Sequence, residues 1–342
     1  MTSTESALPP PSGAPYAPSS DALLSVRGLV KEFPQRGGLP GRPLPPVQAV
    51  SGIDFDVPAG KTHGLVGESG CGKSTVARTV LRLEKPTAGA AMFEGADLFG
   101  MDRTALRDAR RNIQIVFQDP FASLNPRMTV QTIIEEPLVI HGVSSGDERE
   151  ARVADLLRRV GLSPEHANRY PHQFSGGQRQ RVGIARALAL EPRLIIADEP
   201  VSALDVSIQA QVVNLLRDIQ DESGVGYLFI AHDLAIVRNI SDLVSVMYLG
   251  KIVETGTRDE IFDHASHPYT KALLSAVPEP NPVTERVRQR IVLEGDVPSP
   301  ADPPSGCRFR TRCWKAQEQC IHEVPALIDR GAGHPVACHF PE

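Results

Sequence analysis

The nine residues from Gly67 to Thr75, GESGCGKST, have the types and spacing of a phosphate-binding loop, G-x-x-x-x-G-K-[ST]. An apolar segment at 63–66 leads into them, and a segment of helical composition at 75–81 follows. In such a loop the glycines let backbone N–H groups point at an anion, and the following helix adds partial positive charge. Lys73 would reach the β- and γ-phosphates, and the Ser74 hydroxyl would ligate Mg²⁺. We therefore expect a nucleotide site that uses Gly67, Glu68, Ser69, Gly70, Cys71, Gly72, Lys73, Ser74 and Thr75.

A second chemical motif is the apolar segment 194–197, which ends in Asp198 and Glu199. A carboxylate at a strand end can hold Mg²⁺ through water, and the next carboxylate can face the γ-phosphate and polarise an attacking water. Two adjacent acids could also do no more than solvate a strand end. Because a phosphate loop lies upstream, we assign Asp198 to Mg²⁺ and Glu199 to catalysis.

These motifs need strands and helices to position them, and the hydrophobic pattern predicts such elements. We expect strands at 23–33 and 50–57, and amphipathic helices at 148–161 and 206–219. Continuous apolar runs, such as the one at 227–230, are typical of central parallel strands. Strands that alternate with helices around a phosphate loop predict an α/β fold with a mostly parallel sheet.

Composition narrows the setting in which this site would work. The chain has 342 residues and a formal net charge of −5, which gives no support for bulk nucleic-acid binding. No uncharged apolar run approaches the roughly 18 residues that a membrane helix needs, and no secretory signal is expected at the N-terminus. The proline-rich residues 1–20 are expected to form a disordered leader. We expect a cytoplasmic protein that reaches a membrane only through partners.

The segment at 173–181, QFSGGQRQR, resembles the signature motif of ABC transporter ATPases, with Phe174 where the family most often has leucine. The resemblance implies that two ATP molecules are sandwiched between two such domains. It also implies that the start of a helix in this motif faces the phosphates bound by the other subunit. The residues expected to act in trans are Ser175, Gly176, Gly177, Gln178 and Asp205.

Further positions resemble the same family and appear in the family's order over roughly residues 24–257. Gln118 matches the glutamine that senses Mg²⁺ and the attacking water, and His232 matches the histidine that contacts the γ-phosphate. Phe33 matches the aromatic residue that stacks on adenine, although a phenylalanine at a strand end is more often part of a core. The resemblance implies a RecA-like P-loop NTPase that uses ATP and Mg²⁺, with the metal held by Ser74, Gln118 and Asp198.

Two segments, QDPFASLNPRMTV at 118–130 and HPYTKALL at 267–274, resemble the ATPases of bacterial oligopeptide, dipeptide and nickel importers. The segment 28–34 resembles the second of the two ATPases that such importers usually have. The resemblance implies ATP hydrolysis that energises peptide import, at the cytoplasmic face of the membrane. The implied partners are a second ABC ATPase, two membrane permeases and an extracytoplasmic solute-binding protein, without nucleic acid.

Two alternatives stay open for the function. An importer ATPase of the same branch could serve nickel, glutathione or a sugar, and a soluble ABC ATPase of DNA repair or translation would transport nothing. The second class usually carries two fused ATPase domains or a long coiled coil, and this sequence shows neither. The domain plan that we expect is a leader at 1–20, an ATPase domain at 21–265 with a helical subdomain at about 121–180, and a small extension at 266–342.

Four cysteines of the extension form the last candidate site, with gaps of five, six and seventeen residues between them. Disulfides are disfavoured in the cytoplasm, and zinc sites usually contain a Cys-x₂₋₄-Cys pair, which is missing here. Iron–sulfur clusters accept varied spacings. The segment GCRFRTRC at 306–313 resembles the C-terminal region of peptide-importer ATPases, some of which carry a 4Fe–4S cluster. We expect a 4Fe–4S cluster, with zinc and free thiols as the alternatives, on Cys307, Cys313, Cys320 and Cys338.

Overall fold

The computed structural model describes residues 22–35, 38–39, 42–143, 145–278 and 290–342, so the expected leader at 1–20 lies outside the described residues. Its centre is a six-stranded sheet in the order β12-β11-β5-β10-β9-β8. Five of these strands are parallel, and β12 pairs with β11 in the antiparallel sense at one edge. The strands are β5 (Thr62–Val66), β8 (Ile113–Val116), β9 (Leu194–Asp198), β10 (Gly226–Ala231), β11 (Leu243–Tyr248) and β12 (Lys251–Thr257).

The central strands are mostly apolar because both faces of the sheet are covered. On β9, Leu194 and Ile196 belong to one hydrophobic core, whereas Ile195 and Ala197 belong to the other. Successive side chains of a strand point to opposite faces, so a strand buried on both sides needs no polar positions. This arrangement confirms the expected α/β fold with a mostly parallel sheet.

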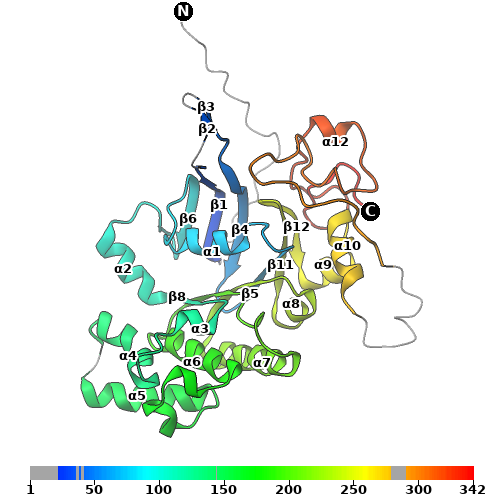
Figure 1. Ribbon diagram of the computed structural model, residues 1–342. Coiled ribbons are helices and arrows are strands. Elements are labelled where there is room, and N and C mark those ends of the chain that lie inside the picture. Colours follow the sequence, from blue (N-terminus) through cyan, green and yellow to red (C-terminus); the bar gives the residue numbers. More distant parts are fainter. Residues whose placement is uncertain (1–21, 36–37, 40–41, 144, 279–289) are drawn as a thin grey trace, which may run out of the picture.

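A second, antiparallel sheet lies beside the phosphate loop, with the strand order β4-β1-β6-β7. It appears in blue and cyan in Figure 1, above the central sheet in that view. Its long strands pair over most of their length, from Leu24 opposite Val57 to Phe33 opposite Val47. The strands are β1 (Ala22–Phe33), β4 (Val47–Pro58), β6 (Ala88–Phe93) and β7 (Ala96–Asp97), and a separate two-stranded hairpin consists of β2 (Gly38–Leu39) and β3 (Arg42–Pro43).

The helices fall into groups that Figure 1 separates in space. Helices α3 to α6 gather at the lower end of that view, and α4 begins with Thr129 as its N-cap and continues through Pro137. Among the described residues, no helix has both the length and the apolar composition needed to cross a membrane. The helices of the ATPase core are α1 (Lys73–Val80), α2 (Arg103–Asn112), α3 (Pro120–Ser123), α4 (Val130–Ile140), α5 (Gly146–Arg159), η1 (Pro164–Asn168), η2 (Pro171–Gln173), α6 (Gly176–Leu188), α7 (Val206–Ser223) and α8 (Leu234–Ile240).

The C-terminal part packs beside the outer edge of β12, at the right of Figure 1, and its residues 335–337 form backbone hydrogen bonds with that edge. It contains α9 (Arg258–Asp263), α10 (Pro268–Ala276) and α12 (Gln319–His322), and most of its remaining chain is irregular. Its anchor is Glu254 of β12, whose side chain is fully buried. One carboxylate oxygen of Glu254 accepts hydrogen bonds from the backbone N–H groups of Ser266 and His267 and lies 2.7 Å from His334 Nε2. A buried carboxylate with these partners fixes the extension to the sheet.

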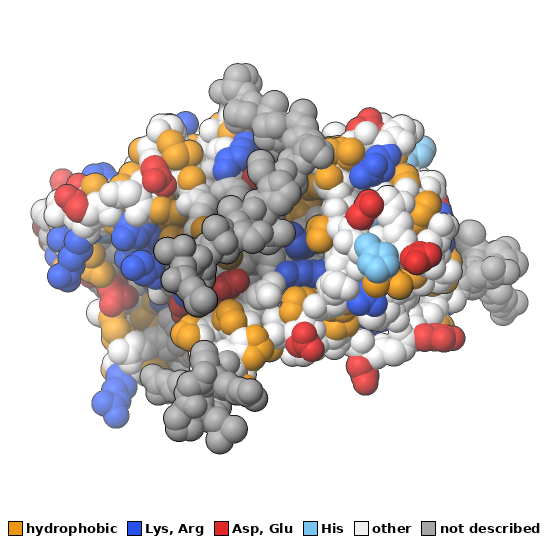
Figure 2. All heavy atoms as spheres, turned by 90° about the horizontal axis from the view of Figure 1, so that it is seen from above, with side chains coloured by type: hydrophobic (Ala, Val, Ile, Leu, Met, Phe, Trp, Pro, Cys, Tyr) orange, Lys and Arg blue, Asp and Glu red, His pale blue; other side chains and the backbone are white. Residues whose placement is uncertain are grey.

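Charged side chains are distributed over the surface without a continuous basic area on the face that Figure 2 shows. Lys and Arg side chains lie there singly and in small groups, with Asp and Glu side chains among them. This pattern agrees with the small negative net charge of the sequence.

Candidate active site

The phosphate loop joins β5 to α1 and is held closely against neighbouring backbone. A Cβ atom on Gly67 would lie 2.1 Å from the carbonyl oxygen of Met247, and one on Gly72 would lie 2.1 Å from that of Ala49. A Cβ atom at either position would overlap a carbonyl oxygen, so this loop conformation requires glycine at both positions. The loop amides and the N-terminus of α1 thereby form a concave anion-binding surface.

Lys73 places a buried cation at the centre of this loop. Its side chain is 3% exposed, and Nζ donates hydrogen bonds to the carbonyl oxygens of Gly67 at 2.7 Å and Glu68 at 3.0 Å. The same ammonium lies 3.9 Å from Glu199 Oε1. A fixed ammonium between the loop and a carboxylate is well placed to bind a phosphate and to hold Glu199 near it.

Ser74 and Asp198 supply adjacent oxygen atoms beside the lysine. The Ser74 hydroxyl donates to Asp198 Oδ1 at 2.8 Å. Burial raises the pKa of Asp198, while the hydrogen bond from Ser74 lowers it. Hydroxyl and carboxylate oxygens are suitable ligands for Mg²⁺, which also keeps ligands from water and phosphate. The pair therefore has the right chemistry for the expected metal site.

The Glu199 carboxylate contacts side chains that follow the two strands on either side of its own. Its Oε2 accepts a hydrogen bond from Gln118 Nε2 at 3.1 Å and lies 3.1 Å from His232 Nδ1. The backbone of Glu199 has a φ of 46°, which lies in the left-handed region that residues other than glycine rarely adopt. Its backbone N–H donates to the carbonyl oxygen of Ile230 at 2.9 Å. The strained backbone is thus tied to β10 and aims the carboxylate at the space above the phosphate loop.

The sheet explains why these distant residues meet. The phosphate loop follows β5, His232 follows β10, Glu199 follows β9 and Gln118 follows β8. These four strands are parallel neighbours in the order β5-β10-β9-β8. Because parallel strands end at the same edge, their following residues are brought together, which is where open α/β sheets bind their ligands.

The signature segment at 173–181 lies away from the phosphate loop of its own chain. Ser175 caps α6: its hydroxyl accepts from the Gln178 N–H at 3.3 Å, and Gln178 Oε1 accepts from the Ser175 N–H at 3.0 Å. Gly177 packs closely on α7, where a Cβ would lie 2.4 Å from Ile208 Cγ2. Among the described residues, neither cavity at the phosphate loop is lined by residues 175–178, and Asp205 lies exposed at the start of α7. The chain therefore does not bring these residues to its own phosphate loop.

The cavity beside the loop also includes residues that the motifs did not indicate. Phe33 is not among its described lining residues, and Lys31 Nζ lies 4.3 Å from the centre of the Phe33 ring. Adenine stacking on Phe33 therefore stays a prediction. Phe33 pairs with Val47, which does line the cavity. Besides the phosphate loop, Gln118 and Glu199, the cavity is lined by residues that belong to no sequence motif: Val47, Gln48, Ala49, Leu249, Gly250 and Pro300.

Comparison with known proteins identifies the family. Residues 50–202 match the model of the ABC transporter family, and residues 253–320 match that of the oligopeptide/dipeptide transporter C-terminal region. The chain is 54% identical over 325 residues to the oligopeptide transport ATP-binding protein AppF of Bacillus subtilis, covering 95% of this chain and 99% of that protein. It belongs to the ATP-binding proteins of ABC transporters.

Other relatives agree with this assignment. The dipeptide transport ATP-binding protein DppF of Haemophilus influenzae is 50% identical over 316 residues, which cover 92% of this chain and 96% of that protein. Among solved structures, the dimeric ATP-binding cassette MJ0796 bound to ADP and Pi has a TM-score of 0.61 at 30% identity. That match covers 69% of this chain and 98% of the cassette. The ABC ATPase assignment thus includes the fold and ATP hydrolysis.

The C-terminal extension of this ABC ATPase contacts the phosphate loop directly. Arg312 forms two hydrogen bonds with the Glu68 carboxylate, at 2.8 and 3.2 Å, and its side chain is 8% exposed. The Glu68 N–H also donates to the Tyr269 hydroxyl at 2.9 Å. The ring of Tyr269 packs against Tyr248 and Phe309. Side chains from α10 and the extension therefore hold one end of the loop, a feature absent from our sequence interpretation.

The four cysteines of the extension line one small cavity, here called the cysteine site. Cys320 lies on α12 and the other three lie in irregular segments, and all of them are free thiols. Burial, with a smaller contribution from the neighbouring thiols, raises the pKa of Cys307 to about 11. Within the described part of the chain, however, no three His, Cys, Asp or Glu side chains are arranged to hold a metal ion. The structure gathers the predicted ligands but gives no support for a bound cluster.

Proposed function

We propose that this ABC ATPase energises the import of peptides across the cytoplasmic membrane. The observation that carries the proposal is the convergence of Gln118, Glu199 and His232 beside Lys73, in a chain that matches AppF over 95% of its length. The match of residues 253–320 to the oligopeptide/dipeptide C-terminal region supports peptides as the solute.

In the proposed mechanism each side chain has one task. The loop amides and Lys73 bind the β- and γ-phosphates, while Ser74, Asp198 and Gln118 would hold Mg²⁺, which supplies neutralising charge at the phosphate oxygens. Glu199 orients and polarises the attacking water. His232 and Gln118 hold the Glu199 carboxylate through its Oε2 atom, which keeps the carboxylate directed at the γ-phosphate.

We further infer that each ATP site is completed by a second ABC ATPase. The helix start at Ser175, Gly176, Gly177 and Gln178, of which Ser175 is exposed, would face the phosphates of the partner, and Asp205 would lie at the same interface. Support comes from the separation of this segment from its own phosphate loop and from the dimeric state of MJ0796. Specific activity of the purified chain should therefore rise with protein concentration, and undiminished activity in a dilute monomeric sample would refute the proposal.

The remaining partners follow from transport. Two membrane permeases would dock near α3 and α4, where Phe121, Val139 and Ile140 expose 64%, 57% and 51% of their surface. Contiguous exposed apolar surface is typical of protein interaction sites, and Val139 and Ile140 are adjacent in the chain. An extracytoplasmic solute-binding protein would deliver the peptide, and this chain would sit peripherally on the cytoplasmic face of the membrane.

The test is reconstitution. Permeases that copurify with this chain are placed in vesicles that contain ATP, the copurified solute-binding protein is added outside, and uptake of a radiolabelled peptide is measured. We expect ATP-dependent uptake of a peptide such as tri-alanine but not of nickel or glutathione. ATP-dependent uptake of nickel or glutathione without uptake of the peptide would contradict peptides as the solute but support the role as a transport ATPase.

A 4Fe–4S cluster at the cysteine site is proposed separately. Its support is the cavity lined by all four thiols, and the absence of an arranged metal site in the described residues argues against it. Protein purified without oxygen should then be brown and contain about four irons per chain. A colourless preparation with one zinc per chain would exclude the cluster and favour zinc.

A further inference from the structure

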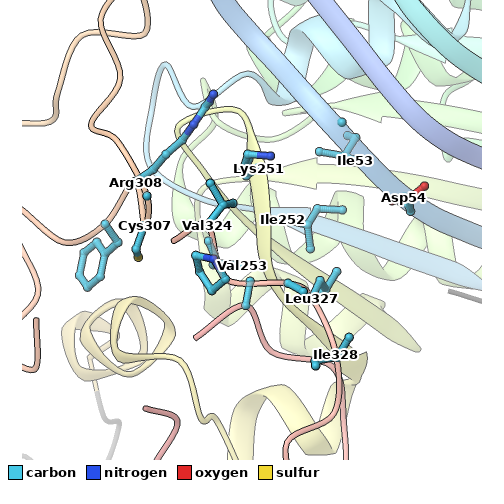
Figure 3. Close-up of a pocket in the computed structure, with 16 residues that line it drawn as sticks. Ile53, Asp54, Lys251, Ile252, Val253, Cys307, Arg308, Val324, Leu327 and Ile328 are labelled. Carbon is cyan, nitrogen blue, oxygen red and sulfur yellow. The ribbon is translucent and has the colours of Figure 1, made fainter. Parts of the chain in front are cut away.

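Another cavity, of about 290 Å³, lies between the ATPase core and the C-terminal extension. Figure 3 shows side chains from β4, from β12 and from two segments of the extension around this space. Its volume is near the lower end of the range of about 300–1,000 Å³ that is usual for small-molecule sites. The walls are mostly aliphatic and comprise Ile53, Ile252, Val253, Val324, Leu327 and Ile328.

Two cations border this apolar space. Lys251 Nζ donates to the carbonyl oxygen of Ser51 at 2.9 Å, and Arg308 Nη2 donates to Gln48 Oε1 at 2.6 Å. Within the described ranges, neither cation forms an ion pair with a carboxylate. Burial lowers the pKa of Lys251, and the charge of Arg308 lowers it further.

One carboxylate, that of Asp54, also lines the cavity, and its Oδ1 accepts a hydrogen bond from the Gly28 N–H at 2.8 Å. Among the described residues that line the cavity, two cations and one carboxylate leave a net charge of one positive unit. A desolvated positive charge next to aliphatic walls favours an occupant that has one negative charge and an apolar body.

Arg308 connects this cavity to the nucleotide site. Its guanidinium bonds the Leu249 carbonyl oxygen as well as Gln48, and both of these residues line the cavity at the phosphate loop. The next residue, Gly250, donates its N–H to the Cys71 carbonyl oxygen at 2.9 Å. A ligand that fixes Arg308 would therefore also fix the wall of the nucleotide site.

We propose that this cavity binds a small monocarboxylate with a branched aliphatic body, and that its occupancy strengthens nucleotide binding. The carboxylate is held by Lys251 and Arg308, and the aliphatic part lies against Ile252 and Leu327. The negative charge removes the repulsion between the two cations and keeps Arg308 on Gln48 and on the turn at 249–250. The site goes beyond the ATPase role and is independent of the transported solute.

Binding is tested on the full-length chain by calorimetric titration with 4-methylpentanoate, and with the uncharged 4-methylpentanamide as the matched ligand. We expect the carboxylate to bind at least about tenfold more tightly, since it alone makes charge-assisted hydrogen bonds. Lys251→Gln should weaken binding of the carboxylate by about tenfold. Val324→Trp, at a residue that is 58% exposed beside the cavity, should block both ligands. Lys61→Gln, at an exposed lysine elsewhere, is the control and should change nothing.

Coupling is tested by titrating the chain with a fluorescent ATP analogue, with and without saturating 4-methylpentanoate. We expect about fivefold tighter nucleotide binding with the carboxylate, and by reciprocity the same factor for the carboxylate when nucleotide is saturating. Equal affinity for the acid and the amide, or carboxylate binding unaffected by Val324→Trp, would overturn the site. Unchanged nucleotide affinity in the wild-type chain would overturn the coupling. Neither result would touch the ATPase role, which depends on Glu199.

Discussion

In the nucleotide site the reacting side chains follow four neighbouring parallel strands, whereas in the cysteine site three of the four thiols lie in irregular segments. The strand order brings Gln118 Nε2 and His232 Nδ1 each to 3.1 Å from Glu199 Oε2. The cysteine site has no such frame, and the position of its chain depends on side-chain anchors such as the buried contact between Glu254 and His334.

The two sites also differ in their electrostatics. The nucleotide site holds the buried ammonium of Lys73 and the carboxylates of Asp198 and Glu199, which suits a charged ligand. In the cysteine site burial raises the pKa of Cys307, Cys313 and Cys338, which favours neutral thiols. A preorganised polar site can bind its ligand with little rearrangement, but neutral thiols must lose protons before they bind a metal. We therefore expect substitutions in the nucleotide site to change ATP binding and hydrolysis. Substitutions in or near the cysteine site should change the packing and stability of the extension.

The largest effect is expected from Glu199→Gln, which keeps the shape of the side chain but removes the charge that polarises water. ATP turnover by the assembled transporter should fall by about 10²–10⁴-fold, while nucleotide still binds. A steady-state phosphate-release assay measures the loss, and Glu318→Gln, at an exposed glutamate of the extension, is the matched control. Turnover close to the wild-type value would contradict the role of Glu199.

Lys73→Ala should instead weaken nucleotide binding itself, because it removes a buried cation with charge-assisted contacts. We expect affinity for a fluorescent ATP analogue to fall by about 10–100-fold. Lys61→Ala removes an exposed lysine that pairs with Asp242 and should have no measurable effect on binding. If both variants bind nucleotide as the wild type does, the loop is not the nucleotide site.

Arg312→Lys tests whether the extension supports the nucleotide site, because Arg312 belongs to the extension but contacts the phosphate loop. Lysine cannot reproduce the two parallel hydrogen bonds to Glu68, so the phosphate loop loses part of its support. Affinity for the same ATP analogue should fall by about tenfold.

The matched control is Arg310→Lys, which alters hydrogen bonds to Ser305 within the extension. A double-mutant cycle with Glu68→Gln should show that the two substitutions are not additive. Additive effects would mean that Arg312 acts on nucleotide binding by another route.

The smallest effect concerns the anchor at His334. The hydrogen bond with Glu254 raises the pKa of His334 in the folded protein above its usual value of 6.5. The group therefore stabilises the fold fully below pH 6.5 and loses this contribution as the pH rises through the folded pKa.

The free energy of unfolding should be about 1–2 kcal/mol lower in His334→Gln than in the wild type at pH 5.5, with a smaller gap at pH 9. Thermal or urea unfolding measures both values, and His322→Gln, at an exposed histidine, is the control. A gap that widens with rising pH would show that His334 is not held in its charged form.

The sequence by itself determined the nucleotide site, because its residues lie in short contiguous motifs that follow apolar strands. Once Gly67–Thr75, Asp198 and Glu199 are placed at the ends of parallel strands, the twist and order of the sheet leave little freedom. The parallel strands were also predictable. A strand that is buried on both faces of the sheet is apolar at successive positions, as at 194–197.

Only the tertiary structure decided how the extension meets the ATPase core. The contacts of Arg312 with Glu68, of Arg308 with Gln48 and of Tyr269 with the loop join residues more than 200 positions apart. No periodicity or motif marks such a pair, because each contact depends on how α10 and the irregular chain of the extension pack against the ATPase core. The cavity between Lys251 and Arg308 arises in the same way, from two surfaces whose complementarity no local pattern records.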